Sequence, residues 1–171
     1  MDRLSARAGW SFAEGDAMTS DQIDLARRAV ASPHWKWLPG MAGQDALGVP
    51  FRVALAHHSG GAMVVAGMAF MPAYPDALAR MVPDLTDPAT LGCLLTLVRE
   101  AWGDPRLVVI YHGEAAYPGQ SEGWAVQCAD NRLPVAGEDY PSEGEALVAA
   151  LEAAPSGSKV ARRGLPDLSS K

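Results

Sequence analysis

The stretch that decides the fold is DPATLGCLLTLVREAW, residues 87–102. Asp87 suits the position before a helix, because its carboxylate can accept hydrogen bonds from free N–H groups of the first turn. Pro88 suits the first helical position, and Gly103 with Pro105 beyond it ends the pattern. The apolar residues recur at helical spacing, which predicts one helix with a buried face formed by Leu91, Leu94, Leu95, Val98, Ala101 and Trp102.

Two further helices are predicted, one on each side of this stretch. Residues 19–22 have the spacing of a capping box, in which two side chains satisfy free N–H groups at the start of a helix over residues 20–31. Pro33 ends that helix, because proline disfavours helical geometry in the residue before it. The same spacing recurs at residues 142–145, so we expect a last helix that reaches residue 154.

Four segments have the character of β-strands. Apolar residues alternate along residues 51–56, and the turn-forming residues 59–61 separate them from the apolar stretch 62–70, which predicts a β-hairpin. Residues 107–111 are β-branched and apolar, and residues 124–128 alternate in character. These two segments predict a second pair of strands.

The order of these elements predicts a two-layer α+β fold. Strands that arrive as hairpins favour one antiparallel sheet of about four strands, and three amphipathic helices must bury their apolar stripes against it. We also expect a short helical turn within residues 74–83. The domain should cover residues 18–154, with an arm at residues 1–17 and a tail at residues 155–171. That tail has one acidic residue and four cations, Lys159, Arg162, Arg163 and Lys171.

Composition limits the classes of partner. The 171 residues carry a net charge of −6, which argues against broad binding to nucleic acid, because such binding needs many lysines and arginines. The longest apolar runs, such as residues 62–71, are about half the length needed to cross a bilayer. Cys93 and Cys128 form no C-x-x-C pair, and no apolar stretch typical of a secretory signal follows the N-terminus. We therefore expect a cytoplasmic protein without a membrane-spanning segment.

Three blocks together resemble one family. They are PHWKWLPGM at residues 33–41, PDLTDPATLGCLL at residues 83–95, continuing to WGDP at residues 102–105, and EALVAALEAA at residues 145–154. The family is a group of uncharacterised small proteins of tailed phages and prophages in GC-rich bacteria. The resemblance implies a phage-related genomic neighbourhood, and it brings no assigned activity and no catalytic or binding residue.

Candidate catalytic residues can be weighed against simpler interpretations. Residues 119–123 match the G-x-S-x-G pattern of serine hydrolases, but a strand rather than a helix should follow Ser121, and every histidine precedes it. His57 and His58 are adjacent on a strand and point to opposite faces, so they should not converge on one metal ion. Together with His112 they leave no familiar ligand pair, and phosphate-loop and dinucleotide motifs are absent from the sequence. We predict no catalytic residue, no metal site and no cofactor.

The most unusual local feature is the segment His34-Trp35-Lys36-Trp37. Aromatic rings beside a cation can stack on unpaired bases or on a planar ligand, so these four residues are the candidate binding residues. The favoured interpretation is that Trp35 and Trp37 anchor the turn after the first helix against the core.

Three functional hypotheses follow. The first is a phage or prophage accessory protein that acts as a non-enzymatic interaction module, binding a host or phage protein and modulating host machinery or defence. The second is a small hydrolase-like or metal-dependent enzyme that uses Ser121, His57, His58 or His112. The third is a binder of single-stranded nucleic acid through residues 34–37, helped by the basic tail.

Overall fold

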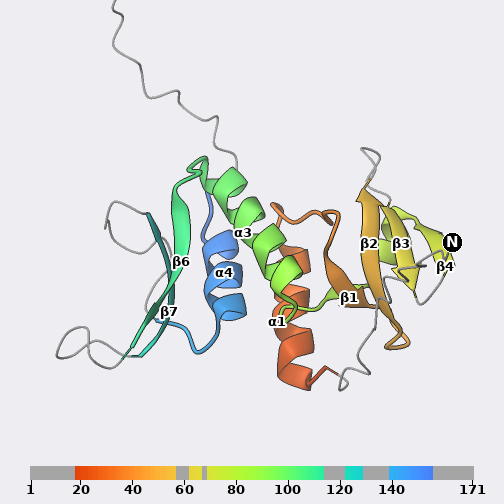
Figure 1. Ribbon diagram of the computed structural model, residues 1–171, viewed down its shortest axis with the longest axis horizontal. Helices are drawn as coiled ribbons and strands as arrows, with labels where there is room; N and C mark the ends of the chain where they lie inside the picture. The colour runs from red at the N-terminus through yellow and green to blue at the C-terminus, as the bar shows by residue number, and fades with distance from the viewer. Residues whose placement is uncertain (1–17, 57–61, 67–68, 114–121, 129–138, 156–171) are drawn as a thin grey trace, which may run out of the picture.

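The computed structural model describes residues 18–56, 62–66, 69–113, 122–128 and 139–155. Within them the fold is α+β, as the sequence predicts (Figure 1). Its elements are α1 (Ser20–Ala31), β1 (Ala42–Gln44), β2 (Pro50–Ala56), β3 (Ala62–Ala66), β4 (Ala69–Ala73), α2 (Pro75–Leu78), β5 (Val82–Pro83), α3 (Pro88–Trp102), β6 (Leu107–His112), β7 (Gly123–Cys128) and α4 (Glu143–Glu152). The expected arm at residues 1–17 and the tail from residue 156 onward lie outside the described residues.

The predicted helices form where their end signals place them. Asp87 accepts a hydrogen bond from the backbone N–H of Thr90 at the start of α3, and Gly103 ends that helix in the left-handed conformation at φ 63°. The capping box of α1 is complete, with Thr19 and Gln22 each satisfying the other's backbone N–H. At α4 the Ser142 hydroxyl accepts from the N–H of residue 145, as predicted, but the helix ends at Glu152, two residues before the predicted end at residue 154. The short turn expected after β4 is α2.

The strands form two antiparallel sheets, where the sequence analysis expected one. Five strands pair in the order β4-β3-β2-β1-β5, and β6 pairs with β7 alone. The apolar stretch 62–70, which was expected as one strand, instead holds β3 and the first part of β4. The very short strands β1 and β5 were not predicted, because three and two residues show no measurable alternation.

The three longer helices lie between the two sheets (Figure 1). The β6–β7 hairpin packs against α3 and α4, and α4 packs against both α1 and α3. On the other side, α1 contacts β5 at the edge of the five-stranded sheet. The expected burial of helical stripes against one sheet is therefore replaced by a helical layer with a sheet on each side. No helix within the described part of the chain is long and apolar enough to cross a membrane.

One hydrophobic core joins these layers. It is built from buried side chains of α1, α3, α4 and both sheets, and its largest fully buried members include Met41, Leu94, Leu97, Leu107, Leu147 and Leu151. Of the stripe predicted for α3, Leu94 and Val98 are fully buried, while Leu91, Leu95 and Trp102 are half-buried and pack against the core.

A polar network fastens the start of α3 to the five-stranded sheet. Arg52 of β2 donates a hydrogen bond of 2.8 Å to the Asp87 carboxylate and also donates to the backbone carbonyl of Gly40. The hydroxyl of Thr90, which is fully buried, accepts from the backbone N–H of Ala42 in β1 at 2.8 Å. The network supplies hydrogen-bond partners to the polar groups at the start of α3 and at the start of β1, and buried polar groups need such partners.

We expect this network to make stability depend on pH. Burial alone would raise the pKa of Asp87, but hydrogen bonds from Arg52 and Thr90 outweigh it and hold that pKa below its ordinary value. A depressed carboxyl pKa stabilises the folded state above the unfolded pKa of about 4, and this contribution is lost as pH falls through the folded pKa. Asparagine can still cap α3, but it loses the charge-assisted hydrogen bond from Arg52, so Asp87→Asn should cost about 1–2 kcal/mol at pH 7 and less at pH 3.

Urea unfolding at the two pH values measures this difference. Asp76→Asn is the matched control, because Asp76 is exposed on α2 and forms no ion pair among the described residues. An Asp87→Asn cost that is unchanged between pH 7 and pH 3 contradicts the network's assigned role.

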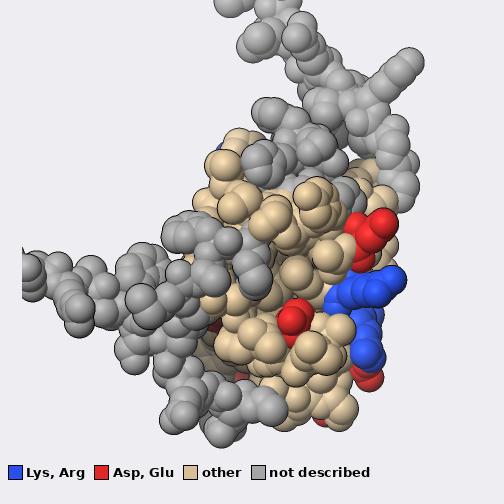
Figure 2. All heavy atoms as spheres, turned by 90° about the vertical axis from the view of Figure 1, so that its right-hand side faces the viewer, with Lys and Arg blue, Asp and Glu red and all other residues tan. Residues whose placement is uncertain are grey.

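The outer part of the five-stranded sheet carries few charges. Strands β2, β3 and β4 contain a single charged residue, Arg52, and Figure 2 shows that most described atoms on this side are uncharged. Leu55, opposite Met63 of β3, is 52% exposed. Pro72 in the edge strand β4 has no N–H to offer, so this edge is a poor template for an added strand.

Candidate functional site

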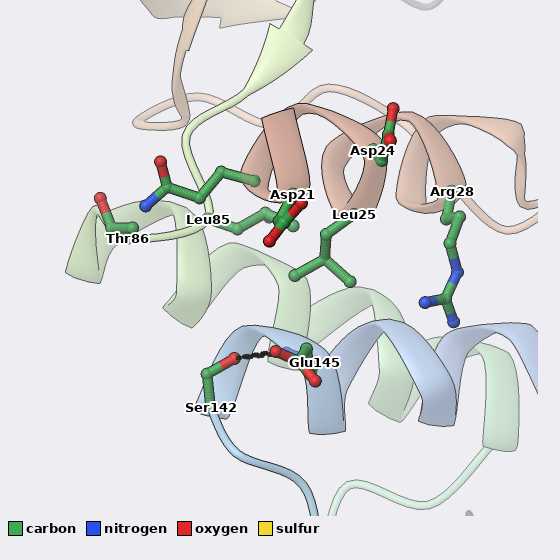
Figure 3. Close-up of a pocket in the computed structure, with 9 residues that line it drawn as sticks. Asp21, Asp24, Leu25, Arg28, Leu85, Thr86, Ser142 and Glu145 are labelled. Carbon is green, nitrogen blue, oxygen red and sulfur yellow. Dashed lines mark hydrogen bonds between the residues drawn. The ribbon is translucent and has the colours of Figure 1, made fainter. Parts of the chain in front are cut away.

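An open groove of about 500 Å³ lies between α1, the first turn of α4 and the connection from β5 to α3 (Figure 3). We call it the acidic groove. Asp21, Leu25 and Arg28 point into it from α1, Glu145 points toward α1 from α4, and Asp24 points away from α4. Its lining includes Asp21, Leu25, Arg28, Leu85, Ser142 and Glu145.

Local sequence signals put two helix starts beside each other here. The capped starts of α1 and α4 both face the groove, and the two helices run in the same direction (Figure 3). Gly144 lets the start of α4 lie close to the connection between β5 and α3, because a Cβ at that position would be only 3.2 Å from the backbone oxygen of Leu85. Acidic side chains in the first turns, Asp21 and Glu145 among them, complement the positive ends of the helix dipoles.

The charges of the groove are only partly neutralised. Arg28 donates hydrogen bonds of 3.0 and 2.6 Å to Glu152, and this pairing raises the pKa of the guanidinium. Asp24 pairs with Arg27 on the same helix. Asp21 and Glu145 have no lysine or arginine within ion-pair distance among the described residues. The end of the groove beside the two helix starts therefore offers the carboxylates of Asp21 and Glu145 to a cationic partner.

The floor of the groove is apolar. Leu85 is buried and Leu25 is half-buried between α1 and α4. An acidic rim above an apolar floor suits a lysine or arginine side chain, because the methylene stem packs on the leucines while the charged head meets the carboxylates. A metal site is a poorer match, since no group of three or more His, Cys, Asp or Glu in the described part of the chain could hold an ion.

The candidate binding segment at residues 34–37 lies elsewhere, between the end of α1 and β1. Trp37 is 8% exposed and packs against Phe51, as the core-anchoring interpretation predicts. Trp35 is half-buried and meets Trp37 edge-on at 83°, so the two rings do not form a parallel stack. Lys36 is paired with Glu100 of α3 at 2.6 Å.

Two polar atoms of this segment remain unexplained. Nε2 of His34 and Nε1 of Trp35 are buried and have no hydrogen-bond partner among the described residues. Leaving buried polar atoms without a partner costs free energy, and a bound ligand could supply the missing hydrogen bonds. A ligand role for the segment therefore stays a prediction.

We expect no significant binding of a short single-stranded oligonucleotide at physiological salt. The net charge of −6 repels a polyanion, and the geometry of Trp35 and Trp37 offers no pair of parallel exposed rings. Tryptophan fluorescence titration of the wild type beside Trp35→Ala and Trp37→Ala measures this. Micromolar affinity that is lost in both variants contradicts the expectation.

The residues proposed for an enzyme are only partly described. His112 at the end of β6 has its Nδ1 3.2 Å from the carboxylate of Asp139, but that nitrogen makes no hydrogen bond among the described residues, whereas a carboxylate that orients a catalytic base accepts one. His57, His58 and Ser121 lie outside the described residues. The enzyme hypothesis therefore stays a prediction, with His112 its one described member.

The acidic groove has no signal of its own in the sequence. Residues 19–22 and 142–145 stood out only as helix caps, and acidic residues near such caps are common for electrostatic reasons. The missing information is the contact between α1 and α4, which brings Asp21 and Glu145 to one groove from positions far apart in the chain.

Comparisons with protein-family models, with curated proteins and with solved structures find no match to this chain.

Proposed function

We propose that the protein is a non-enzymatic interaction module that binds a lysine- or arginine-containing segment of another protein in the acidic groove. One observation carries the proposal. Asp21 and Glu145 form no ion pair among the described residues, although Glu145 lies within electrostatic reach of Arg28, and both stand above the apolar floor of a groove of about 500 Å³. Such a site offers a cationic side chain both charge and apolar contact.

The groove suits recognition better than chemistry. It is open, and its polar residues at the helix starts already have structural roles: Ser142 caps α4 and donates a hydrogen bond of 3.3 Å to Glu145. An ion pair at an exposed rim adds only about 0.2–1 kcal/mol, so we expect moderate affinity and strong dependence on salt.

The partner that we propose is a host or phage protein, in keeping with the family that the three sequence blocks resemble. A cytoplasmic location and a role in modulating host machinery or defence belong to the same proposal. The chemistry of the groove adds one requirement, which is that the partner present a basic, accessible segment.

A short fluorescein-labelled peptide of alternating arginine and glycine tests the proposal by fluorescence anisotropy with the full chain. We expect saturable binding at low salt that weakens as salt is raised. A peptide of alternating glutamine and glycine is the neutral control. Equal binding of the two peptides, or no binding of the arginine peptide at low salt, contradicts the proposed function.

A further inference from the structure

We propose that the chain's own basic tail, residues 156–171, occupies the acidic groove through Arg162 and Arg163 and competes there with an outside partner. The inference rests on the proposed function, because it uses the same groove and the same chemistry. It adds a regulatory element, which is an internal competitor that a partner must displace.

Charge complementarity is the first argument. The net charge of the chain is −6, yet the tail holds four cations and one acidic residue. The groove has the opposite sign, since Asp21, Asp24 and Glu145 line it against one described cation, Arg28, which is itself paired with Glu152. The charge of the groove and its apolar floor together match an arginine side chain.

The position of the tail is the second argument. It follows Pro155, just beyond α4, and the first turn of the same helix lines the groove. The 10 residues of α4 span about 15 Å at a rise of 1.5 Å per residue. Arg162 is seven positions beyond Pro155, and an extended chain of seven steps spans about 23 Å. Arg162 and Arg163 can therefore return along α4 to Glu145 and Asp21.

Linkage within one chain makes a weak contact effective. A short tether gives its two ends an effective concentration on the order of millimolar. Half occupancy at that concentration requires about 4 kcal/mol of interaction. Two exposed ion pairs supply up to about 2 kcal/mol, and the packing of both arginine stems on the apolar floor has to supply the rest. An outside segment must exceed this internal competitor in charge, in apolar contact or in concentration.

The test compares the full chain with its full-length Arg162→Ala/Arg163→Ala variant by ¹⁵N NMR. We expect the amide signals of Asp21, Leu25 and Glu145 to differ between the two proteins at low salt and to converge at high salt. Ser169→Ala/Ser170→Ala is the matched control, because it alters the same tail without changing its charge, and it should leave those signals in place. The arginine–glycine peptide should bind the Arg162→Ala/Arg163→Ala variant about three- to tenfold more tightly than the wild type.

The outcomes separate the two proposals. Groove signals that are identical in the wild type and the double-arginine variant overturn tail docking, and equal peptide binding by both then leaves the proposed function in place. Tail-dependent shifts without peptide binding to either protein support docking and overturn the proposed function. Shifts that grow with protein concentration point to contact between chains and overturn docking within one chain.

Discussion

Replacing Leu94 with alanine should lower the free energy of unfolding by about 2–5 kcal/mol. Leu94 lies in the middle of α3, has no exposed surface and belongs to the core that joins the helices to both sheets. Alanine loses the transfer free energy of the removed methyl groups and leaves a cavity, because a closely packed core relaxes only in part. A loss of this size is a large share of the 5–15 kcal/mol that stabilises a typical domain.

Urea unfolding followed by circular dichroism measures the loss. Leu47→Ala is the matched control, since it makes the same chemical change in the connection between β1 and β2, where Leu47 is 87% exposed. We expect the control to change stability by no more than about 0.5 kcal/mol. Equal losses in the two variants contradict the assignment of α3 to the centre of the core.

Local signals explain which parts of the fold were predictable. The bounds of α1 and α3 were predicted correctly because each has an N-cap residue and a stop signal next to it in the chain, such as Asp87 and Gly103 for α3. The division of strands between two sheets was not predictable, because it depends on contacts between distant segments. Strand β1 is held by β2, β5 and the Thr90 hydroxyl, and its three residues carry no pattern of their own.

The candidate site was less predictable than the fold. The segment at residues 34–37 drew attention for its composition, and the structure gives Trp37 a place in the core that composition alone could not distinguish from a binding role. Asp21 and Glu145 are ordinary first-turn residues in sequence. They form a site only because α1 and α4 pack side by side in the same direction, which is a tertiary property.

Removing the two groove carboxylates that form no ion pair should weaken binding of the arginine–glycine peptide about tenfold in the Arg162→Ala/Arg163→Ala protein, where the tail does not compete for the same charges. Asp21→Asn and Glu145→Gln keep the shape of each side chain and remove only its charge. Each exposed ion pair contributes about 0.2–1 kcal/mol, and about 1.4 kcal/mol corresponds to a factor of ten in affinity. Glutamine at position 145 can still accept the hydrogen bond from Ser142, so α4 should remain capped.

A matched variant separates the groove from the overall charge of the protein. Asp76→Asn/Glu100→Gln removes the same two negative charges from α2 and from the last turn of α3, outside the groove lining. The loss of the exposed Lys36–Glu100 ion pair in this variant should cost less than about 1 kcal/mol of stability. If net charge alone attracted the peptide, the two double variants would bind it equally weakly.

Fluorescence anisotropy of the labelled arginine–glycine peptide tests the central claim most directly when all proteins carry Arg162→Ala/Arg163→Ala, so that the tail does not compete. In that background the acidic groove as a binding site predicts about tenfold weaker binding on adding Asp21→Asn/Glu145→Gln, and an affinity within about twofold of the parent on adding Asp76→Asn/Glu100→Gln. Unchanged affinity in the groove variant, or equal losses in both variants, contradicts the claim that this groove binds a basic segment.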